Sequence, residues 1–136
     1  MEKYTIAKDI PVFYITAGSF PNGVEAAHKK LRAKMAPDDN RTFFGISHSD
    51  GKGNIIYKAA AEELYAGETE KLGLEKFVIK KGEYMSQLLP NFCDNVAVVG
   101  ETFKELLALP DLDPQGYCLE LYLSLADMRC MVPLKK

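Results

Sequence analysis

The chain has 136 residues, a length typical of one domain and too short for a catalytic domain with an appended regulatory one. A full-length transcription regulator is therefore excluded. The 17 basic and 19 acidic residues leave a formal net charge of −2, whereas nucleic-acid-binding modules usually present a strongly basic surface, so direct binding to nucleic acid is not expected. No apolar run approaches the roughly 20 residues that span a bilayer, and Met1–Thr5 lacks the pattern of a secretory signal. We expect a soluble, cytoplasmic protein with no membrane contact.

Cysteine and histidine provide no metal-binding pattern. The 3 cysteines, Cys93, Cys118 and Cys130, form no CxxC pair, so we expect free thiols. The 2 histidines, His28 and His48, fall in separate segments, which favours surface or half-buried imidazoles over zinc ligands. The glycines form neither GxGxxG nor a phosphate-binding loop. We therefore predict no metal and no cofactor.

The first half of the chain predicts a strand, a helix and a hairpin. Residues 12–17 are β-branched and aromatic, which is typical of a strand. From Val24 to Met35, apolar residues recur at helical spacing, with charged residues between them. Residues 41–49 and 54–62 then read as two strands around the turn sequence Asp50-Gly51-Lys52-Gly53.

After a polar connection at residues 66–73, the same order of elements recurs. The expected elements are a strand at 76–82, an amphipathic helix at 96–107, and two strands at 117–124 and 128–134. Positions 45 and 120 share their pattern of alternation at an offset of 75 residues, and Leu31 and Leu106 share it too. A duplication of this kind predicts two half-sheets related by a pseudo-twofold axis.

The predicted fold is therefore α+β, with tandem βαββ repeats, pseudo-twofold symmetry, one antiparallel sheet, two main helices and a central ligand groove. A single domain covers residues 1–136. Repeat one spans about 1–65, a connector about 66–75, and repeat two about 76–136.

Strand alternation places Glu120 and Tyr122 on one face of their strand. Phe43 and Gly45 occupy the matching face of the first half, and the glycine would leave room opposite the carboxylate. Tyr57 and Tyr84 are the other rings expected nearby. A carboxylate within aromatic walls suits an organic cation, since each well-placed ring adds about 0.5–2 kcal/mol of cation–π attraction. The alternative is that Glu120 simply faces solvent on a one-sided sheet.

Three motifs resemble the GyrI-like, or AraC-type effector-binding, domains, which include the drug-binding parts of bacterial multidrug-sensing regulators. Ile79-Lys80-Lys81-Gly82-Glu83-Tyr84 resembles the family's I-x-x-G-x-Y sequence. Cys118-Leu119-Glu120-Leu121-Tyr122 resembles its strand with a central glutamate, and Met131-Val132-Pro133-Leu134 its closing segment. The resemblance implies a groove in which Glu120 attracts the positive charge of lipophilic drugs.

The sequence departs from this family in two respects. Relatives often carry a tryptophan in or after the second helix, where this chain has Phe103 and Leu107, so Phe103 is expected to line the groove. The chain also has no helix-turn-helix segment, so any role in transcription regulation would require a separate regulatory protein partner.

Three functions follow from these observations and from the resemblance. The first is a stand-alone module that binds small cationic amphipathic or drug-like molecules for sequestration or sensing. The second is a hydrolase of strained, cyclopropane-containing electrophiles, in which Glu120 would activate water and Tyr122 or Tyr84 would assist. The third is a protein-binding inhibitor similar to the gyrase-inhibitor branch of the family.

Overall fold

The computed structural model describes residues 1–35, 40–124 and 126–135. Within these residues the chain forms an eight-stranded antiparallel sheet, three α-helices and one short 3-10 helix. In chain order the elements are β1 (Glu2–Ile6), β2 (Ile10–Thr16), α1 (Val24–Arg32), β3 (Phe43–Ser49), β4 (Ile55–Glu62), α2 (Glu68–Leu72), β5 (Glu75–Ile79), β6 (Gly82–Leu89), η1 (Phe92–Asp94), α3 (Ala97–Leu107), β7 (Cys118–Tyr122) and β8 (Met128–Pro133). The predicted α+β class and antiparallel sheet are confirmed.

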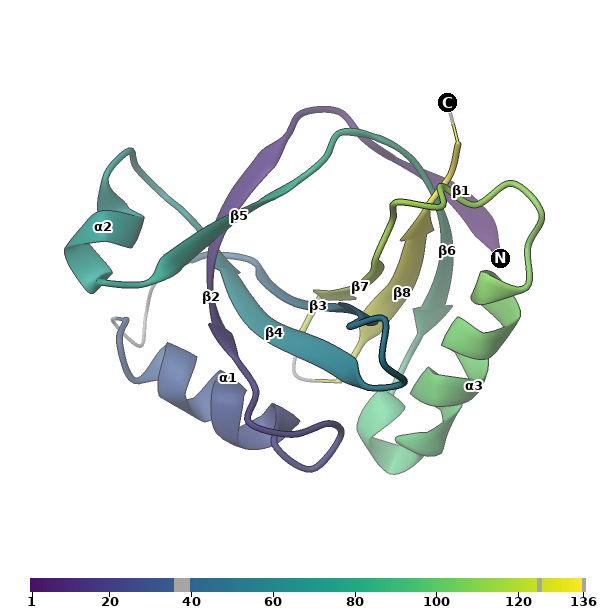
Figure 1. Cartoon of the computed structure of the whole chain (residues 1–136), viewed down its shortest axis with the longest axis horizontal. Coiled ribbons are helices and arrows are strands. Elements are labelled where there is room, and N and C mark those ends of the chain that lie inside the picture. Colours follow the sequence, from purple (N-terminus) through teal and green to yellow (C-terminus); the bar gives the residue numbers. More distant parts are fainter. Residues whose placement is uncertain (36–39, 125, 136) are drawn as a thin grey trace.

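The strands follow the order β1-β6-β8-β7-β3-β4-β2-β5, so β3 and β7 form the centre of the sheet. The sheet curls into a half-barrel, and the connections from β1 to β2 and from β5 to β6 pass over its open side (Figure 1). In the central pair, Gly45 lies directly opposite Glu120 and Phe43 opposite Tyr122. The two positions related by the 75-residue offset are therefore neighbours across the middle of the sheet.

The two faces of the sheet have different surroundings. The concave side, here the inner face, carries Phe44, Leu119, Leu121 and Met131, which pack with each other in one core cluster. The convex side, here the helix-covered face, contacts α1 over β2 and β4, and α3 over β6 and β8. Since the two helices pack over the flanking strands, the space between them faces the central strands β3 and β7.

Three elements differ from the sequence-based expectation. Strands β1 and β6 were not predicted, and the expected connector contains α2. Strand β1 is an edge strand with mostly exposed residues, so it needs no apolar pattern. Strand β6 buries the polar residue Ser86, which obscures its alternation. The segment 76–82, predicted as one strand, is divided between β5 and β6 at Lys80-Lys81, and Gly82 adopts a φ of 140° that glycine tolerates.

A buried ion pair holds the short helix α2. Arg41 Nη2 lies 2.8 Å from Glu68 Oε2, and the two side chains are 2% and 7% exposed. Arg41 also donates from Nη1 to the Glu62 carbonyl oxygen at 2.9 Å. A bidentate guanidinium–carboxylate pair of this kind fixes the orientation of both groups. The start of β3 is thereby tied to the connection between the two halves of the chain.

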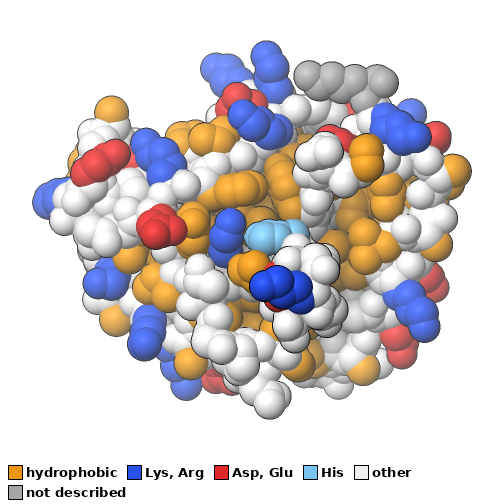
Figure 2. All heavy atoms as spheres, viewed as in Figure 1, with side chains coloured by type: hydrophobic (Ala, Val, Ile, Leu, Met, Phe, Trp, Pro, Cys, Tyr) orange, Lys and Arg blue, Asp and Glu red, His pale blue; other side chains and the backbone are white. Residues whose placement is uncertain are grey.

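Basic and acidic side chains are interspersed around the face shown in Figure 2, with apolar side chains nearer its middle. Within the described residues, no helix is long and apolar enough to cross a membrane.

Candidate functional site

Glu120 lies at the centre of the helix-covered face. It projects from β7, and Tyr122 projects in the same direction two residues further along the strand. Tyr57 reaches the same point from β4, on the other side of β3. Tyr57 is buried, while Glu120 and Tyr122 are partly accessible. Two tyrosines from different strands therefore meet one carboxylate in the middle of the sheet.

Both tyrosines donate to the same carboxylate oxygen. The hydroxyl oxygens of Tyr57 and Tyr122 each lie 2.6 Å from Glu120 Oε1. Each phenol has one hydroxyl hydrogen, so the 3.2 Å contact between the two hydroxyl oxygens is not a further hydrogen bond when Glu120 is ionised. Short hydrogen bonds to an ionised acceptor are stronger than neutral ones. The pair holds the carboxylate in one orientation.

His28, from α1, extends this network by one member. Its Nε2 lies 2.9 Å from the Tyr57 hydroxyl oxygen. Because the Tyr57 hydrogen is directed at Glu120, the imidazole must be the donor, which assigns the proton of the neutral ring to Nε2. The hydrogen bonds thus run in one direction, from His28 to Tyr57 to Glu120, and they connect helix α1 to the central strand.

Gly45 provides the space that this arrangement occupies. A Cβ atom at position 45 would lie 2.1 Å from the Tyr57 hydroxyl oxygen and 2.2 Å from Glu120 Oε1. Both distances are far below van der Waals contact. Any residue larger than glycine at position 45 would displace both the Tyr57 hydroxyl and the Glu120 carboxylate, or shift the strand itself.

Aromatic rings surround the carboxylate. Phe20 stacks on Tyr57 with ring centroids 5.9 Å apart, and Phe92 packs against Tyr122 at 5.9 Å. His28 meets Tyr122 edge-on at 5.4 Å. Phe20 is 43% exposed, which leaves its ring available at the surface.

The electrostatics of the site are those of a carboxylate without a countercharge. Burial raises the pKa of Glu120, and the hydrogen bonds from Tyr122 and Tyr57 only partly oppose this effect. Burial and the nearby Arg32 lower the pKa of His28 to about 4, so the imidazole is neutral at pH 7. Among the described residues, no lysine or arginine forms an ion pair with Glu120. A partly desolvated negative charge of this kind favours an incoming cation.

The structure brings together most of the residues expected from the sequence. Phe43 pairs with Tyr122 across β3 and β7, and Phe103 of α3 packs in the same apolar cluster as Tyr122. Tyr84 was placed wrongly near Glu120, because it lies on the inner face of β6. Its hydroxyl donates to the Lys80 carbonyl oxygen at 2.7 Å and contacts the Tyr117 hydroxyl at 2.7 Å.

Sequence reasoning missed His28, Phe20 and Phe92. His28 lies four residues after Val24 and three before Leu31, the spacing of the apolar face of α1, which was a usable signal. Phe20 lies in the turn before α1, and Phe92 begins the three-residue helix η1, which is too short to show a periodic pattern. The two rings reach the site because the segments before α1 and after β6 pass beside it in the folded structure.

The cysteines nearest the carboxylate are poor candidates for nucleophiles. Burial raises the pKa of Cys118 to about 11 and that of Cys130 to about 12. Both thiols are therefore protonated at neutral pH, and a thiol is a weak nucleophile. In the part of the chain that the structure describes, no three His, Cys, Asp or Glu side chains gather as metal ligands would.

Comparison with known proteins identifies the fold. No family profile matches the sequence, and no curated protein matches it either. An integron cassette protein from the mobile metagenome of Vibrio cholerae has a TM-score of 0.69 at 14% identity, covering 98% of this chain and 95% of that one. The shared property is the half-barrel architecture.

Two further solved structures have the same architecture. SAV2435, solved bound to tetraphenylphosphonium, has a TM-score of 0.65 at 11% identity, covering 98% of this chain and 93% of that one. A hydrolase from Listeria innocua has a TM-score of 0.62 at 13% identity, covering 98% of this chain and 90% of that one.

Proposed function

We propose that the protein binds small, amphipathic organic cations in the space between α1 and α3, with Glu120 as the charge anchor. The observation that carries this proposal is a partly accessible carboxylate, held by Tyr57 and Tyr122, without a cationic partner among the described residues. Both tyrosines bind Oε1. Oε2 is therefore the oxygen available to a ligand.

The energetics favour a cation that also carries apolar or aromatic groups. Attraction between charges is stronger away from water than in it. The rings of Phe20, Tyr122 and Phe92 each offer about 0.5–2 kcal/mol of cation–π attraction to a suitably placed positive charge. A small hydrated metal ion would gain little from these rings. A lipophilic cation gains from both the rings and the carboxylate.

The comparison structures add support from the fold. SAV2435 was solved with tetraphenylphosphonium, a lipophilic cation, and its fold is similar to that of this chain. We also propose that the chain forms a GyrI-like domain, on the resemblance of its three motifs.

A tandem organisation of the domain is part of this proposal. The strand order β1-β6-β8-β7-β3-β4-β2-β5 reads the same in reverse when β1–β4 are exchanged with β5–β8, which supports two repeated halves. The pair Gly45–Glu120 lies at the middle of that order. The site would then stand where the two halves meet.

Calorimetric titration with tetraphenylphosphonium tests the binding proposal. We expect saturable binding by the unaltered chain and at least about tenfold weaker binding by Glu120→Gln, since the variant keeps the shape but loses the charge. The matched control is Glu101→Gln, which removes an exposed carboxylate on α3 and should leave binding unchanged. Tetraphenylborate, of similar shape and opposite charge, should not compete. Equal affinity of Glu120→Gln and the unaltered chain would exclude Glu120 as the anchor.

A second candidate function is hydrolysis of a strained, cyclopropane-containing electrophile. The observation that favours it is the raised pKa of Glu120, because a carboxylate with a raised pKa is a better general base near neutral pH. Glu120 would take a proton from water as the water oxygen bonds to a ring carbon. The strained carbon–carbon bond would break, with its electron pair moving to an electron-accepting group of the substrate. The proton held by Glu120 would then pass to the resulting anion, which completes the addition of one water.

Mass spectrometry separates the two functions. Incubation with an electrophilic cyclopropane would give a product heavier by one water if the chain is a hydrolase, and Glu120→Gln would abolish that product. Binding of tetraphenylphosphonium without any water adduct would support the binding module alone.

A further inference from the structure

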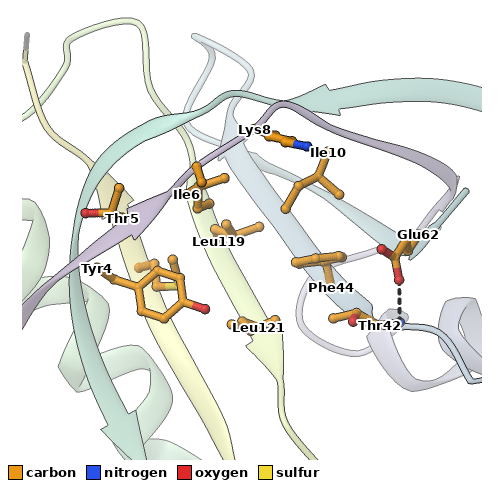
Figure 3. A pocket seen from close by; sticks show the side chains of 12 residues that line it. Tyr4, Thr5, Ile6, Lys8, Ile10, Thr42, Phe44, Glu62, Leu119 and Leu121 are labelled. Atoms are coloured by element: carbon orange, nitrogen blue, oxygen red, sulfur yellow. Dashed lines mark hydrogen bonds between the residues drawn. The ribbon is translucent and has the colours of Figure 1, made fainter.

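A cavity lies on the inner face of the sheet, behind the central strands. Its volume is about 410 Å³, within the range of small-molecule sites. Its lining residues are Tyr4, Thr5, Ile6, Ala7, Lys8, Ile10, Thr42, Phe44, Glu62, Leu119, Leu121 and Met131. Figure 3 shows these side chains converging from β1, the start of β2, β3 and β7.

The cavity is separate from the Glu120 site. Leu119 and Leu121 flank Glu120 in sequence and point to the opposite face of β7, and Phe44 is related to Gly45 in the same way. One layer of sheet therefore divides the two sites. Occupation of the inner cavity does not require the cation site to function.

The walls are apolar, and the polar groups at the rim are the Lys8 ammonium, three hydroxyls and the Glu62 carboxylate. Phe44, Leu119 and Met131 are almost fully buried and form the floor. Lys8 is exposed and reaches over the rim near Ile10 (Figure 3). Within residues 1–35, 40–124 and 126–135, the structure gives neither the Lys8 ammonium nor the Tyr4 hydroxyl a hydrogen bond or ion pair.

One carboxylate also stands at the rim, but part of it is already engaged. Glu62 Oε1 accepts a hydrogen bond from the Thr42 backbone N–H at 3.2 Å, which holds the group beside β3. Lys8 has a flexible four-carbon stem and three donors, so it is free to turn toward a ligand. Among the described residues, the rim groups without a partner include the Lys8 ammonium and the Tyr4 hydroxyl, and both can donate hydrogen bonds. They favour a ligand that supplies acceptors and a negative charge.

We propose that the inner cavity binds a medium-chain carboxylate, with its hydrocarbon tail against Phe44, Leu119 and Met131 and its head group at Lys8. Taking about 30 Å³ for each water-sized group, the cavity of about 410 Å³ holds about 14 methylene-sized groups. Decanoate is the matching probe. Burial of its tail supplies the affinity, and Lys8 selects the head group.

Methyl NMR tests the location directly. Met131 lines the cavity, whereas Met128, on the same strand, packs under α3 on the helix-covered face. Titration with decanoate, below its micelle-forming concentration, should shift the Met131 methyl resonance in a saturable manner and leave Met128 in place. Absence of a Met131 shift, or a shift of Met128 alone, would overturn the proposal.

Head-group exchange and two rim variants test the chemistry. Lys8→Met should weaken decanoate binding by about fivefold and leave decanol binding unchanged, since it removes an exposed charge but keeps the apolar stem. Glu62→Gln removes the like charge and should strengthen decanoate binding. If decylammonium shifts Met131 at lower concentrations than decanoate, or if Glu62→Gln weakens decanoate binding, the assigned ligand class is wrong. Glu120→Gln should leave decanoate binding unchanged, which separates this site from the cation site.

Discussion

Replacing Gly45 by alanine puts a methyl group where two oxygen atoms now lie. The added Cβ would be 2.1 Å from the Tyr57 hydroxyl oxygen and 2.2 Å from Glu120 Oε1. Ordinary contacts at about 3.5 Å require both oxygens to lie roughly 1.3–1.4 Å further from the Cβ, through movement of the side chains or of the strand. A shift of that size disrupts the 2.6 Å hydrogen bond between Tyr57 and Glu120.

The cost has two parts. Crowding a packed site typically costs about 1–3 kcal/mol, and loss of a hydrogen bond to a charged group costs about 1.5–3 kcal/mol. Partial accessibility lets Glu120 turn toward water, which moderates the sum. We expect Gly45→Ala to lower the free energy of unfolding by about 2–4 kcal/mol. For a domain of this size that is a fall of about 10 °C in Tm.

Urea denaturation and calorimetric titration with tetraphenylphosphonium are the two assays. The matched control is Gly100→Ala in α3, where an added Cβ has no atom within 4 Å and alanine favours the helix by about 1 kcal/mol. Gly45→Ala should lose both stability and cation affinity, and Gly100→Ala should lose neither. A Gly45→Ala protein within about 0.5 kcal/mol of the unaltered chain, with the same cation affinity, would refute the proposed packing of Gly45 against Glu120.

The remaining predictions concern the same hydrogen bonds and one ion pair. Tyr57→Phe removes the buried donor to Glu120 and leaves the His28 N–H without its acceptor, so unfolding measurements should show a loss of about 1–3 kcal/mol; unchanged stability would contradict the network. Burial raises the pKa of Glu120, so the carboxylate should become protonated at a higher pH than an ordinary carboxylate, whose pKa is near 4.5. Cation affinity, measured by calorimetry over a pH series, should therefore fall as the pH is lowered through that raised pKa. A pH-independent affinity would contradict an ionised anchor. Arg41→Met leaves the buried carboxylate of Glu68 without its ion-pair partner and should lower the free energy of unfolding, measured by urea denaturation, by about 3–5 kcal/mol. The double variant that also carries Glu68→Met should recover much of that loss.

Glu68 and Glu120 should affect the pH dependence of unfolding in opposite directions. The hydrogen bond from Arg41 lowers the pKa of Glu68, so its contribution to stability is present above 4.5 and is lost as pH falls through the lowered value. The raised pKa of Glu120 means that the ligand-free protein loses stability as pH rises from 4.5 through that raised value. Unfolding free energies of Glu68→Gln and Glu120→Gln between pH 3 and pH 8 measure the two effects separately. The same slope for both variants would contradict this assignment.

Local patterns in the sequence predicted much of the sheet. The hairpin of β3 and β4 was predicted to within two residues, because alternation and the turn Asp50–Gly53 are short-range signals. Helices α1 and α3 were predicted from their apolar periodicity. Strands β1 and β6 were not predicted, because neither shows a clear alternation of apolar and polar residues. Strand β1 is an exposed edge strand, and β6 buries a serine.

The sequence by itself determined which side chains share a face. Strand alternation alone places Glu120 and Tyr122 on the same face of their strand, and Phe43 and Gly45 on the same face of theirs, because successive residues of a strand point in opposite directions. The tertiary structure decided which faces meet. It placed Tyr57 beside Glu120 and Tyr84 behind the sheet, although both are tyrosines on strands, since strand order and curvature are set by contacts between residues far apart in the chain. Among the residues that the structure describes, Glu120 also has no countercharge, and that isolation, which no local pattern encodes, makes the carboxylate a candidate binding group.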